Sequence, residues 1–438
     1  MKNTRPAFAR WLSRKISAAD AAAAIDRILA SRFFQNKPIL WLFIAGFSAV
    51  FIIQALQFVW VWNTDSPSYY LAARGILRHI NIYDDQQFVR LANDVLGKAR
   101  IVYPYLYWPF LAQLFTPLSF LPIRNFFVVF HALNVLLAFL GLYLVGKLLN
   151  LKESKTNFLI MFLCALLVAN VPLLTTIEYG QINLLVLDLI LLALVLLRKN
   201  RMYLSSLCLC LAVLIKVYPV LFFFVFLFQK KYRYLLYAAL NGLGVFLVSI
   251  ALFGKTVWLE FLKSGLKTFS ATTQSPFTLH YIAHMNNNTF KSFILQLFPT
   301  APAGLQSVLS WLTPGLLVGF LVYLYLARTS LLRDQSNFGT SIILMASLFI
   351  SPITWFHHFV IMLFPLAYLA SRIVIERRYG YFVPFGLLAA FILYNPLYGG
   401  FPFNQFRLFA SLGFLILLLH FGYKRRRPRD GYLSTASP

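Results

Sequence analysis

Residues 39–61 read ILWLFIAGFSAVFIIQALQFVWV, an apolar run without a single charged side chain. A helix needs about 20 such residues to cross the hydrocarbon core of a bilayer, and it pairs its own backbone groups, which cannot face lipid unpaired. A basic leader precedes the run and a polar stretch follows it. The run therefore predicts a first transmembrane helix that leaves the cytoplasm.

The composition extends this prediction to the whole chain. Of the 438 residues, 60% are hydrophobic and 12% are charged, against about 45–50% and about 25% in ordinary soluble domains. This excludes a conventional water-soluble fold, and we expect an all-α polytopic membrane protein with about 12 transmembrane helices. The predicted spans are residues 39–61, 125–147, 157–176, 181–197, 203–216, 218–229, 234–254, 305–327, 338–354, 356–372, 381–396 and 405–422.

The basic residues set the predicted orientation. The formal net charge is +26, but the basic side chains lie in short clusters between apolar runs, which argues for the positive-inside pattern and against a nucleic-acid partner. We expect a basic cytoplasmic surface helix over residues 1–38, a transmembrane domain over 39–422 and a basic cytoplasmic tail over 423–438. The outer loops are then residues 62–104 and 255–304.

Two segments leave the span count open. Residues 103–122 are apolar but carry four prolines, so we expect a re-entrant or interfacial pair of short helices there. Residues 203–229 contain Lys216 and Pro219, and they fit either two short spans or one broken helix.

Five polar segments, far apart in sequence, fall on the extracytoplasmic face of this topology. Their convergence on one face suggests a functional site. The segments are Asn63-Thr64-Asp65-Ser66, Glu178 to Asn183, Lys216 alone, His280 to Thr289, and Ser351 to His358.

Each segment also has a structural explanation. Asp65 follows the first span, where an ionisable residue is costly unless it has a functional role or a partner. It could equally cap a helix that begins at Ser66-Pro67. Gly180 fits a tight polar turn. Lys216 could snorkel to the interface or hold an anionic head group. Two adjacent histidines on a helix point about 100° apart, so we expect one of His357 and His358 to face the site and the other to pack.

Metal sites are not expected. Cys164, Cys208 and Cys210 lie inside apolar runs without metal-like partner spacing, and we interpret them as small core residues. The Asp84-Asp85 pair lies in a polar stretch, where a solvated turn is the favoured interpretation.

The ordered motifs resemble glycosyltransferase family 87, which includes polyprenyl-phosphate-mannose-dependent mannosyltransferases of the C-type superfamily. The resemblance spans about residues 39–400, although Asn286 to Thr289 matches the family's Asn-Gln-Ser-like loop only loosely. The motifs are Asp65 with Tyr69-Tyr70, Ile82-Tyr83, Tyr103-Pro104 with Pro117-Leu118, Gly180-Gln181-Ile182-Asn183, Ile215-Lys216-Val217-Tyr218-Pro219, and Ser351-Pro352 through Trp355 to His357-His358.

The resemblance implies transfer of a sugar outside the cytoplasm of a bacterial inner membrane, from a polyprenyl-phosphate-linked donor to a lipid or glycan acceptor, with inversion and without a cofactor. Mannose is the family's best-known donor sugar. By resemblance Asp65 is the general base, and Lys216, His357 and His358 are candidates to receive the leaving phosphate. The expected substrate-binding residues are Tyr69, Tyr70, Glu178, Gln181, Asn183, Lys216, His284, Asn288, Trp355, His357 and His358.

Two other classes of function remain open at this point. A transporter or flippase of lipid-linked saccharides would also be basic and polytopic, but it should show internal repeats and ionisable residues at mid-membrane. No clear repeat of the halves is present, and Asp188, the one acid deep inside a late span, fits a buried hydrogen-bonded carboxylate as well as a transport site. A structural assembly subunit predicts no clustering of polar motifs.

Overall fold

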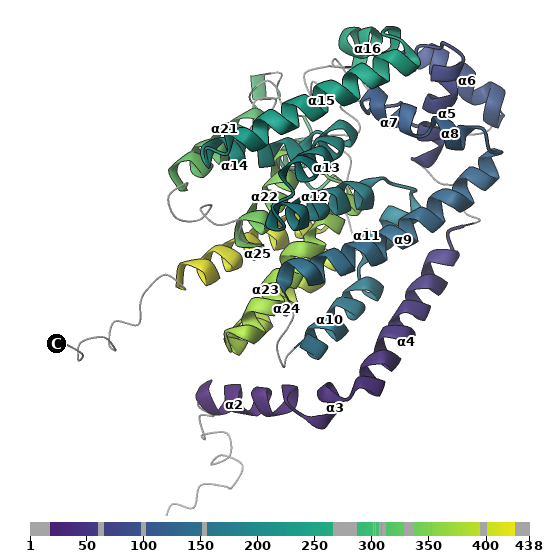
Figure 1. The fold of residues 1–438 in the computed structure, drawn as a ribbon. Coiled ribbons are helices and arrows are strands. Elements are labelled where there is room, and N and C mark those ends of the chain that lie inside the picture. The colour runs from purple at the N-terminus through teal and green to yellow at the C-terminus, as the bar shows by residue number, and fades with distance from the viewer. Residues whose placement is uncertain are drawn as a thin grey trace, which may run out of the picture.

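The computed structural model describes residues 18–59, 65–97, 102–150, 156–265, 287–300, 312–327, 337–351, 353–394 and 401–424, with short pieces at 302, 304–305 and 308. Within these residues every regular element is helical (Figure 1). The helices form an elongated bundle with short helices gathered at one end.

Five helices are long and apolar enough to cross a membrane, and a bent pair would make six, judged over the described residues. The pair is α10 (Thr156–Val168) and α11 (Val171–Glu178), which meet at 46°. The twelve predicted spans are therefore not confirmed. The five are α4 (Lys37–Leu56), α9 (Ile123–Leu149), α15 (Tyr232–Phe253), η3 with α23 (Phe356–Ile375), and η5 with the first part of α25 (Phe403–Gly422).

The other predicted spans fold as helices that are too short to cross alone. α13 has 14 residues, which corresponds to about 21 Å against a hydrocarbon core of about 30 Å. It ends at Ile215, and Lys216 is extended before the next helix begins, so the chain is broken where the sequence left two interpretations open. The short helices are α12 (Asn183–Arg198), α13 (Met202–Ile215), η1 with α14 (Tyr218–Phe228), α21 (Leu312–Ala327), α22 (Asn337–Ile350), and η4 with α24 (Tyr379–Leu393).

The segment predicted as an outer polar loop is itself helical. α5 (Ser66–Leu77) and α6 (Asp85–Leu96) occupy most of it, because Ser66-Pro67 and Asp84 both provide helix starts. Asp84 accepts a hydrogen bond from the Gln87 backbone N–H at 2.9 Å and so caps α6, which corrects its assignment to a solvated turn.

The proline-rich run forms two short helices, α7 (Pro109–Leu114) and α8 (Thr116–Ser119), as the prolines suggested. Together with α5, α6 and α16 (Thr256–Glu260), they lie at the upper end of the bundle in Figure 1. The site described below is built around this end.

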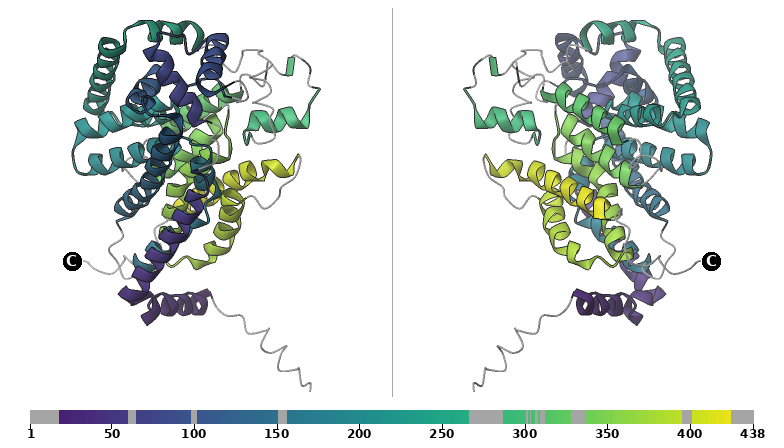
Figure 2. Two further views of the ribbon diagram at one scale, coloured as in Figure 1. Left: turned by 90° about the vertical axis from the view of Figure 1, so that its right-hand side faces the viewer. Right: turned by 90° about the vertical axis from the view of Figure 1, so that its left-hand side faces the viewer.

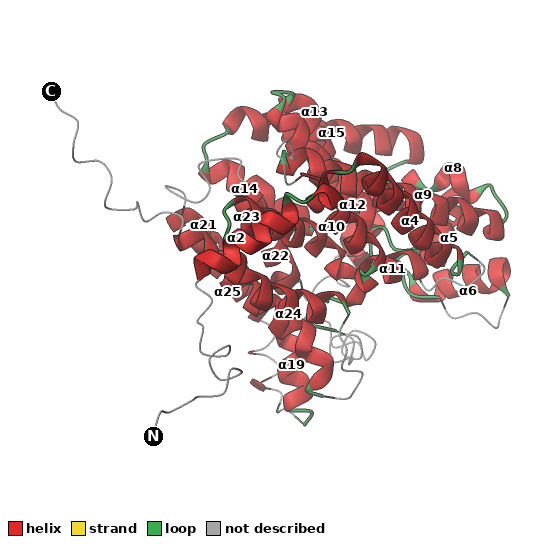
Figure 3. Cartoon of the chain, turned by 90° about the horizontal axis from the view of Figure 1, so that it is seen from below, coloured by secondary structure: helices red, strands yellow, loops and turns green. Residues whose placement is uncertain are grey.

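The helices α2 (Ala18–Leu29) and α3 (Arg32–Gln35) lie at the opposite end, and α2 runs across the bundle (Figure 2, Figure 3). Tyr379 donates a hydrogen bond to Asp26 of α2, and the Arg377 Nε lies 3.1 Å from the same carboxylate. These contacts attach α2 to the turn before α24. Residues 1–17 of the predicted basic surface helix and residues 425–438 of the predicted tail lie outside the described residues.

The core is centred on α12, which packs between α9 and α13. Leu187, Ile190 and Leu191 are fully buried there. Asp188 is also buried, and a Cβ added at Gly141 of α9 would lie 2.8 Å from its Oδ1. Among the described residues neither carboxyl oxygen of Asp188 has a hydrogen-bond partner, so the hydrogen-bonded carboxylate, one of the two interpretations left open for Asp188, is not found.

This close approach predicts that Gly141→Ala destabilises the bundle by about 1–3 kcal/mol, because overpacking must displace Asp188 or the facing helix. Gly146→Ala, on the same helix, is the matched control because a Cβ there meets no atom within 4 Å. The control should be neutral or stabilise by up to about 1 kcal/mol, since alanine favours a helix interior. Thermal unfolding of the purified variants in detergent measures both, and equal shifts for the two would contradict the packing argument.

Candidate functional site

The candidate site gathers side chains from five chain segments at one end of the bundle. Asp65 and Tyr69 come from the start of α5, and Tyr107 comes from the stretch before α7. The turn between α11 and α12 supplies Gln181 and Asn183. Lys216 follows α13, and η3 supplies the two histidines. Helix ends meet here, so backbone groups without intrahelical partners lie beside polar side chains.

Asp65 occupies the N-cap position of α5, but its side chain makes no capping hydrogen bond. Its backbone N–H donates to the Tyr179 carbonyl oxygen at 3.1 Å, which ties the start of α5 to the end of α11. The half-buried Asp65 is thus fixed in position through its backbone, and its side chain does not cap the helix. Burial raises the pKa of Tyr69 and of Tyr107, and the negative charge of Asp65 raises both further, so Asp65 lies within electrostatic range of the cluster.

Tyr69, Tyr107 and Gln181 form a hydrogen-bonded triangle. The two phenol oxygens are 3.0 Å apart, and they lie 3.3 and 3.5 Å respectively from Gln181 Oε1. Burial raises the pKa of Tyr107 above its usual range, and the charge of Asp65 raises it further. Burial likewise raises the pKa of Tyr69. Both phenols therefore stay protonated at neutral pH and remain hydrogen-bond donors.

Lys216 points to the interior of this cluster. Its Nζ donates to Asn183 Oδ1 at 2.5 Å, lies 3.3 Å from His358 Nε2, and stands 5.7 Å from the centroid of the Tyr107 ring. These contacts do not fit a side chain that snorkels to an interface. They fix a positive charge at the break between two apolar helices, and the alternative, that Lys216 holds an anionic head group, stays a prediction.

The hydrogen bonds of His358 decide which ring nitrogen carries its proton. The Trp355 backbone N–H donates to Nδ1 at 3.0 Å. A backbone N–H can only donate, so Nδ1 is the acceptor and the neutral ring carries its proton on Nε2. The His358 Nε2–H and the charged Lys216 ammonium are then both hydrogen-bond donors, and their nitrogen atoms lie 3.3 Å apart. Such a pair is suited to binding an anion.

Asn183 links the cation to the histidine segment. Its Oδ1 accepts from Lys216, and its Nδ2 donates to the His357 carbonyl oxygen at 3.1 Å. Thr176 Oγ1 also lies 3.1 Å from that carbonyl. The buried His357 ring packs 4.5 Å from the His358 ring and 5.6 Å from Tyr179, measured between centroids. His358 thus meets Lys216 while His357 packs, although the segment is a 3₁₀ helix in which the rings stay close.

The remaining expected residues are placed differently. Tyr70 donates to the Leu121 carbonyl oxygen at 2.9 Å, and its ring lies under Arg74, so the structure does not bring it to this cluster. Glu178 is half-buried at the end of α11, next to the Tyr179 carbonyl that holds Asp65. His284 lies outside the described residues.

Asn288 and Trp355 contribute through the backbone. The Asn288 N–H donates to the Thr354 carbonyl oxygen at 2.8 Å, which joins the loop before α19 (Phe290–Leu297) to the segment leading into the histidines. Trp355 orients His358 through its N–H. Both residues therefore support the histidine segment.

Two members of the cluster were missed by the sequence reasoning. Tyr107 contacts Tyr69, Gln181 and Lys216, and Thr176 lies against the His357 carbonyl. The aromatic stretch from Tyr103 to Trp108 is a signal that could have marked Tyr107, but only its prolines and the Tyr103-Pro104 motif entered the prediction. Nothing in the sequence marks Thr176.

The described residues contain no group of three or more His, Cys, Asp or Glu side chains able to hold a metal ion. Cys164 and Cys210 are buried in α10 and α13, as expected for core residues, and Cys208 is half-buried.

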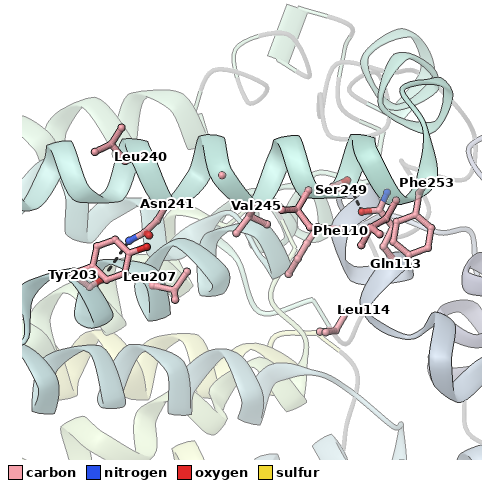
Figure 4. Close-up of a pocket in the computed structure, with 13 residues that line it drawn as sticks. Phe110, Gln113, Leu114, Tyr203, Leu207, Leu240, Asn241, Val245, Ser249 and Phe253 are labelled. Atoms are coloured by element: carbon pink, nitrogen blue, oxygen red, sulfur yellow. Dashed lines mark hydrogen bonds between the residues drawn. The ribbon is translucent and has the colours of Figure 1, made fainter.

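An apolar groove of about 410 Å³ opens on the side of the bundle between α7, α13 and α15 (Figure 4). Leu240, Val248 and Leu252 are exposed along it. At one end the Ser249 hydroxyl donates to Gln113 Oε1 at 2.6 Å. Two of its walls lead to the site, because α7 directly follows Tyr107-Trp108 and α13 ends beside Lys216.

Comparison with family models gives a match to Glycosyltransferase family 87 over residues 105–352, which is more than half of the chain. The chain belongs to glycosyltransferase family 87. It is therefore a membrane glycosyltransferase, as the resemblance implied, which favours an enzyme over a transporter or a structural subunit. Comparison with curated proteins and with solved structures finds no match.

The matched region contains Tyr107, Gln181, Asn183 and Lys216. Asp65 and the two histidines lie on either side of it in sequence. The fold brings these flanking segments to the matched region, which supplies the cation and the amide that hold the cluster together.

The pair of donors at Lys216 and His358 predicts that Lys216→Met weakens binding of a lipid phosphate by about 10- to 100-fold, because a hydrogen bond to a charged group contributes about 1.5–3 kcal/mol. Lys216→Arg keeps the charge and should retain part of the affinity. Lys231→Met is the control, because the Lys231 ammonium lies outside the site, 5.5 Å from the centroid of the Phe226 ring. Direct binding to the detergent-solubilised protein is the measurement, and unchanged affinity in Lys216→Met would rule out phosphate binding by this cation.

Proposed function

We propose that this membrane glycosyltransferase moves a hexose, with mannose as the first sugar to test, from a polyprenyl-phosphate-linked donor to a lipid or glycan acceptor with inversion. One observation carries the proposal: Asp65 interacts electrostatically with Lys216, and the Lys216 Nζ lies 3.3 Å from His358 Nε2. Transfer of a sugar from a phosphate needs these two functions, a base for the acceptor and donors for the leaving group.

In the proposed reaction the acceptor hydroxyl oxygen attacks the anomeric carbon of the donor sugar. Its proton passes to the Asp65 carboxylate, and the bond from the anomeric carbon to the phosphate oxygen breaks with its electron pair leaving on that oxygen. A single displacement of this kind inverts the anomeric centre. Asp65 suits the base role because it is an acid at the start of α5 within electrostatic range of Lys216.

The leaving group explains why two donors would be useful. A polyprenyl-phosphate sugar is a phosphodiester with one negative charge, whereas the departing polyprenyl phosphate carries a second charge as the bond breaks. The Lys216 ammonium and the His358 Nε2–H would therefore stabilise the transition state more than the bound donor, which is the condition for raising kcat. Asn183 holds the cation in place for this role.

The groove beside α15 supports a lipid-linked donor. We assign it to the isoprenoid chain, because it is apolar, opens on exposed leucine and valine side chains, and has walls that lead to Tyr107 and Lys216. A chain in this groove would bring its phosphate to the end of the bundle that carries the site. The positive-inside pattern supports placing that end outside the cytoplasm, in the periplasm of a bacterial inner membrane.

The groove assignment predicts that Gly244→Trp raises KM for a long-chain donor at least several-fold, while a donor with a chain of about ten carbons is little affected. Gly244 lines the groove, and a Cβ added there meets no atom within 4 Å, so a larger side chain at this position begins in the open space of the groove. Gly319→Trp on α21, also in open space, is the control. Equal KM changes for both chain lengths would contradict the assignment.

The base assignment predicts that Asp65→Asn lowers kcat by about 10²–10⁴-fold, the usual contribution of a general base. Stability should be unchanged, because asparagine suits the N-cap position as well as aspartate does and the wild-type carboxylate makes no capping bond. The matched control is Asp84→Asn, the same substitution at a carboxylate that does cap a helix. It should retain turnover.

The assay uses purified protein with a panel of polyprenyl-phosphate sugars, followed by mass spectrometry of extracted lipids. Near wild-type turnover by Asp65→Asn would refute the assignment of Asp65 and make Glu178 the next acid to test. No transfer by the wild-type protein from any polyprenyl-phosphate sugar would refute the donor class.

A further inference from the structure

Arg407 is a buried cation near the start of α25. It is the second residue of α25 (Phe406–Lys424), and its side chain is 1% exposed. Its Nε donates to the Ile392 carbonyl oxygen at 2.8 Å, one of the carbonyls at the end of α24 that lack an intrahelical partner. Removing a guanidinium from water is expensive, so its remaining contacts must compensate for lost hydration.

Two of those contacts are aromatic faces in η3 (Phe356–Met362). The guanidinium carbon lies 4.4 Å from the centroid of the Phe356 ring and 5.6 Å from that of Phe359. At such distances a desolvated cation is attracted to the negative face of an aromatic ring. The two phenylalanines directly flank His357 and His358 in sequence, so Arg407 contacts the residue on either side of the histidine pair.

A neighbouring residue holds the chain that leads into the histidines. The fully buried Gln405 donates through Nε2 to the Asn287 carbonyl oxygen at 3.1 Å. Asn287 Oδ1 accepts from the Thr354 N–H, and the Asn288 N–H donates to the Thr354 carbonyl, both at 2.8 Å. The segment from Gln405 to Arg407 thus braces the approach to η3 and η3 itself.

We propose that Arg407 is a positioning residue for glycosyl transfer, acting through Phe356 and Phe359 to keep the His358 Nε2–H at Lys216. The expected loss of activity rests on the proposed function. The role of Arg407 goes beyond that function, because Arg407 lies outside the region matched to the family. Arg407 touches no substrate in this role. Its planar guanidinium can stack on an aromatic ring while its Nε–H donates a hydrogen bond in the plane of the guanidinium. Lysine cannot make both contacts in this way.

The test compares Arg407→Lys with Arg198→Lys in the full-length purified protein. Arg198 donates to the Leu148 carbonyl oxygen at the end of α9 and to Asn337, so it is a partly buried arginine at a helix end without a part in the site. We expect Arg407→Lys to lower kcat about 10- to 100-fold per folded molecule with little change in donor KM, because an error of about 1 Å in placing a catalytic group can cost 10²-fold. Arg198→Lys should leave kcat unchanged.

A double-mutant cycle identifies the path of the effect. In a Phe356→Leu background the aromatic face is already lost, so Arg407→Lys should lower kcat by less than about 3-fold further. Full additivity of the two changes would overturn the proposal, as would an Arg407→Lys protein that loses thermal stability but keeps wild-type kcat.

A second readout separates this proposal from the proposed function. The measurement is NMR of protein labelled with ¹⁵N-histidine, in which the His358 signals are assigned by comparison with His358→Gln. The wild type and Arg198→Lys should show the Nε2–H tautomer of His358, whereas Arg407→Lys should show a mixture of tautomers. An unchanged His358 tautomer in Arg407→Lys would overturn the positioning role whatever sugar the enzyme transfers. Failure of the sugar-transfer assay in the wild type would refute the proposed function and leave this measurement standing.

Discussion

The hydrogen bond from Lys216 to Asn183 is the contact on which the candidate site depends. A lysine ammonium among apolar helices must find an acceptor, because hydration is lost there. Asn183 provides that acceptor with one amide atom and donates to the His357 carbonyl with the other. One side chain therefore fixes both the position of the cation and the position of the histidine segment. Reversal of this amide would break both contacts at once.

The breaks between helices explain why the polar residues meet where they do. α11 ends, α12 begins, α13 ends and η3 begins around the same cluster. Helix ends expose backbone N–H and C=O groups that need partners, and several site contacts use them: the Tyr179 carbonyl holds the Asp65 N–H, and the Trp355 N–H holds His358. The proposed chemistry thus occupies the places where an apolar bundle already has to supply polar partners.

The cluster divides into a region matched to the family and two flanking segments that supply the acid and the histidines. The flanking segments are held by contacts to the backbone, at Tyr179 for Asp65 and at Thr354 for the segment leading to the histidines. Backbone contacts of this kind tolerate changes of side chain. The placement of Asp65 and His358 therefore depends on the fold as much as on the residues next to them in sequence.

The sequence by itself determined the helical class, the position of most helices, the break at Lys216 and the acid that follows the first span. These features follow from local rules: apolar runs, proline, and the cost of a charge among apolar residues. The family resemblance also followed from the sequence, because its motifs are short runs in a fixed order. The number of membrane spans did not follow from the sequence, because the length of an apolar run does not fix where the helix inside it ends. Helix α13, for example, ends at Ile215.

Only the tertiary structure decided which side chains of the motifs face one another. Tyr69 and Tyr70 are adjacent in sequence, yet Tyr69 joins Gln181 while Tyr70 turns to the Leu121 carbonyl, because neighbours on a helix point about 100° apart. Tyr107, Thr176 and Arg407 carry no local pattern that separates them from other aromatic, hydroxyl or basic residues. Their contacts join residues 38, 181 and 51 positions apart in the chain, and distances of that kind are set by how the helices pack.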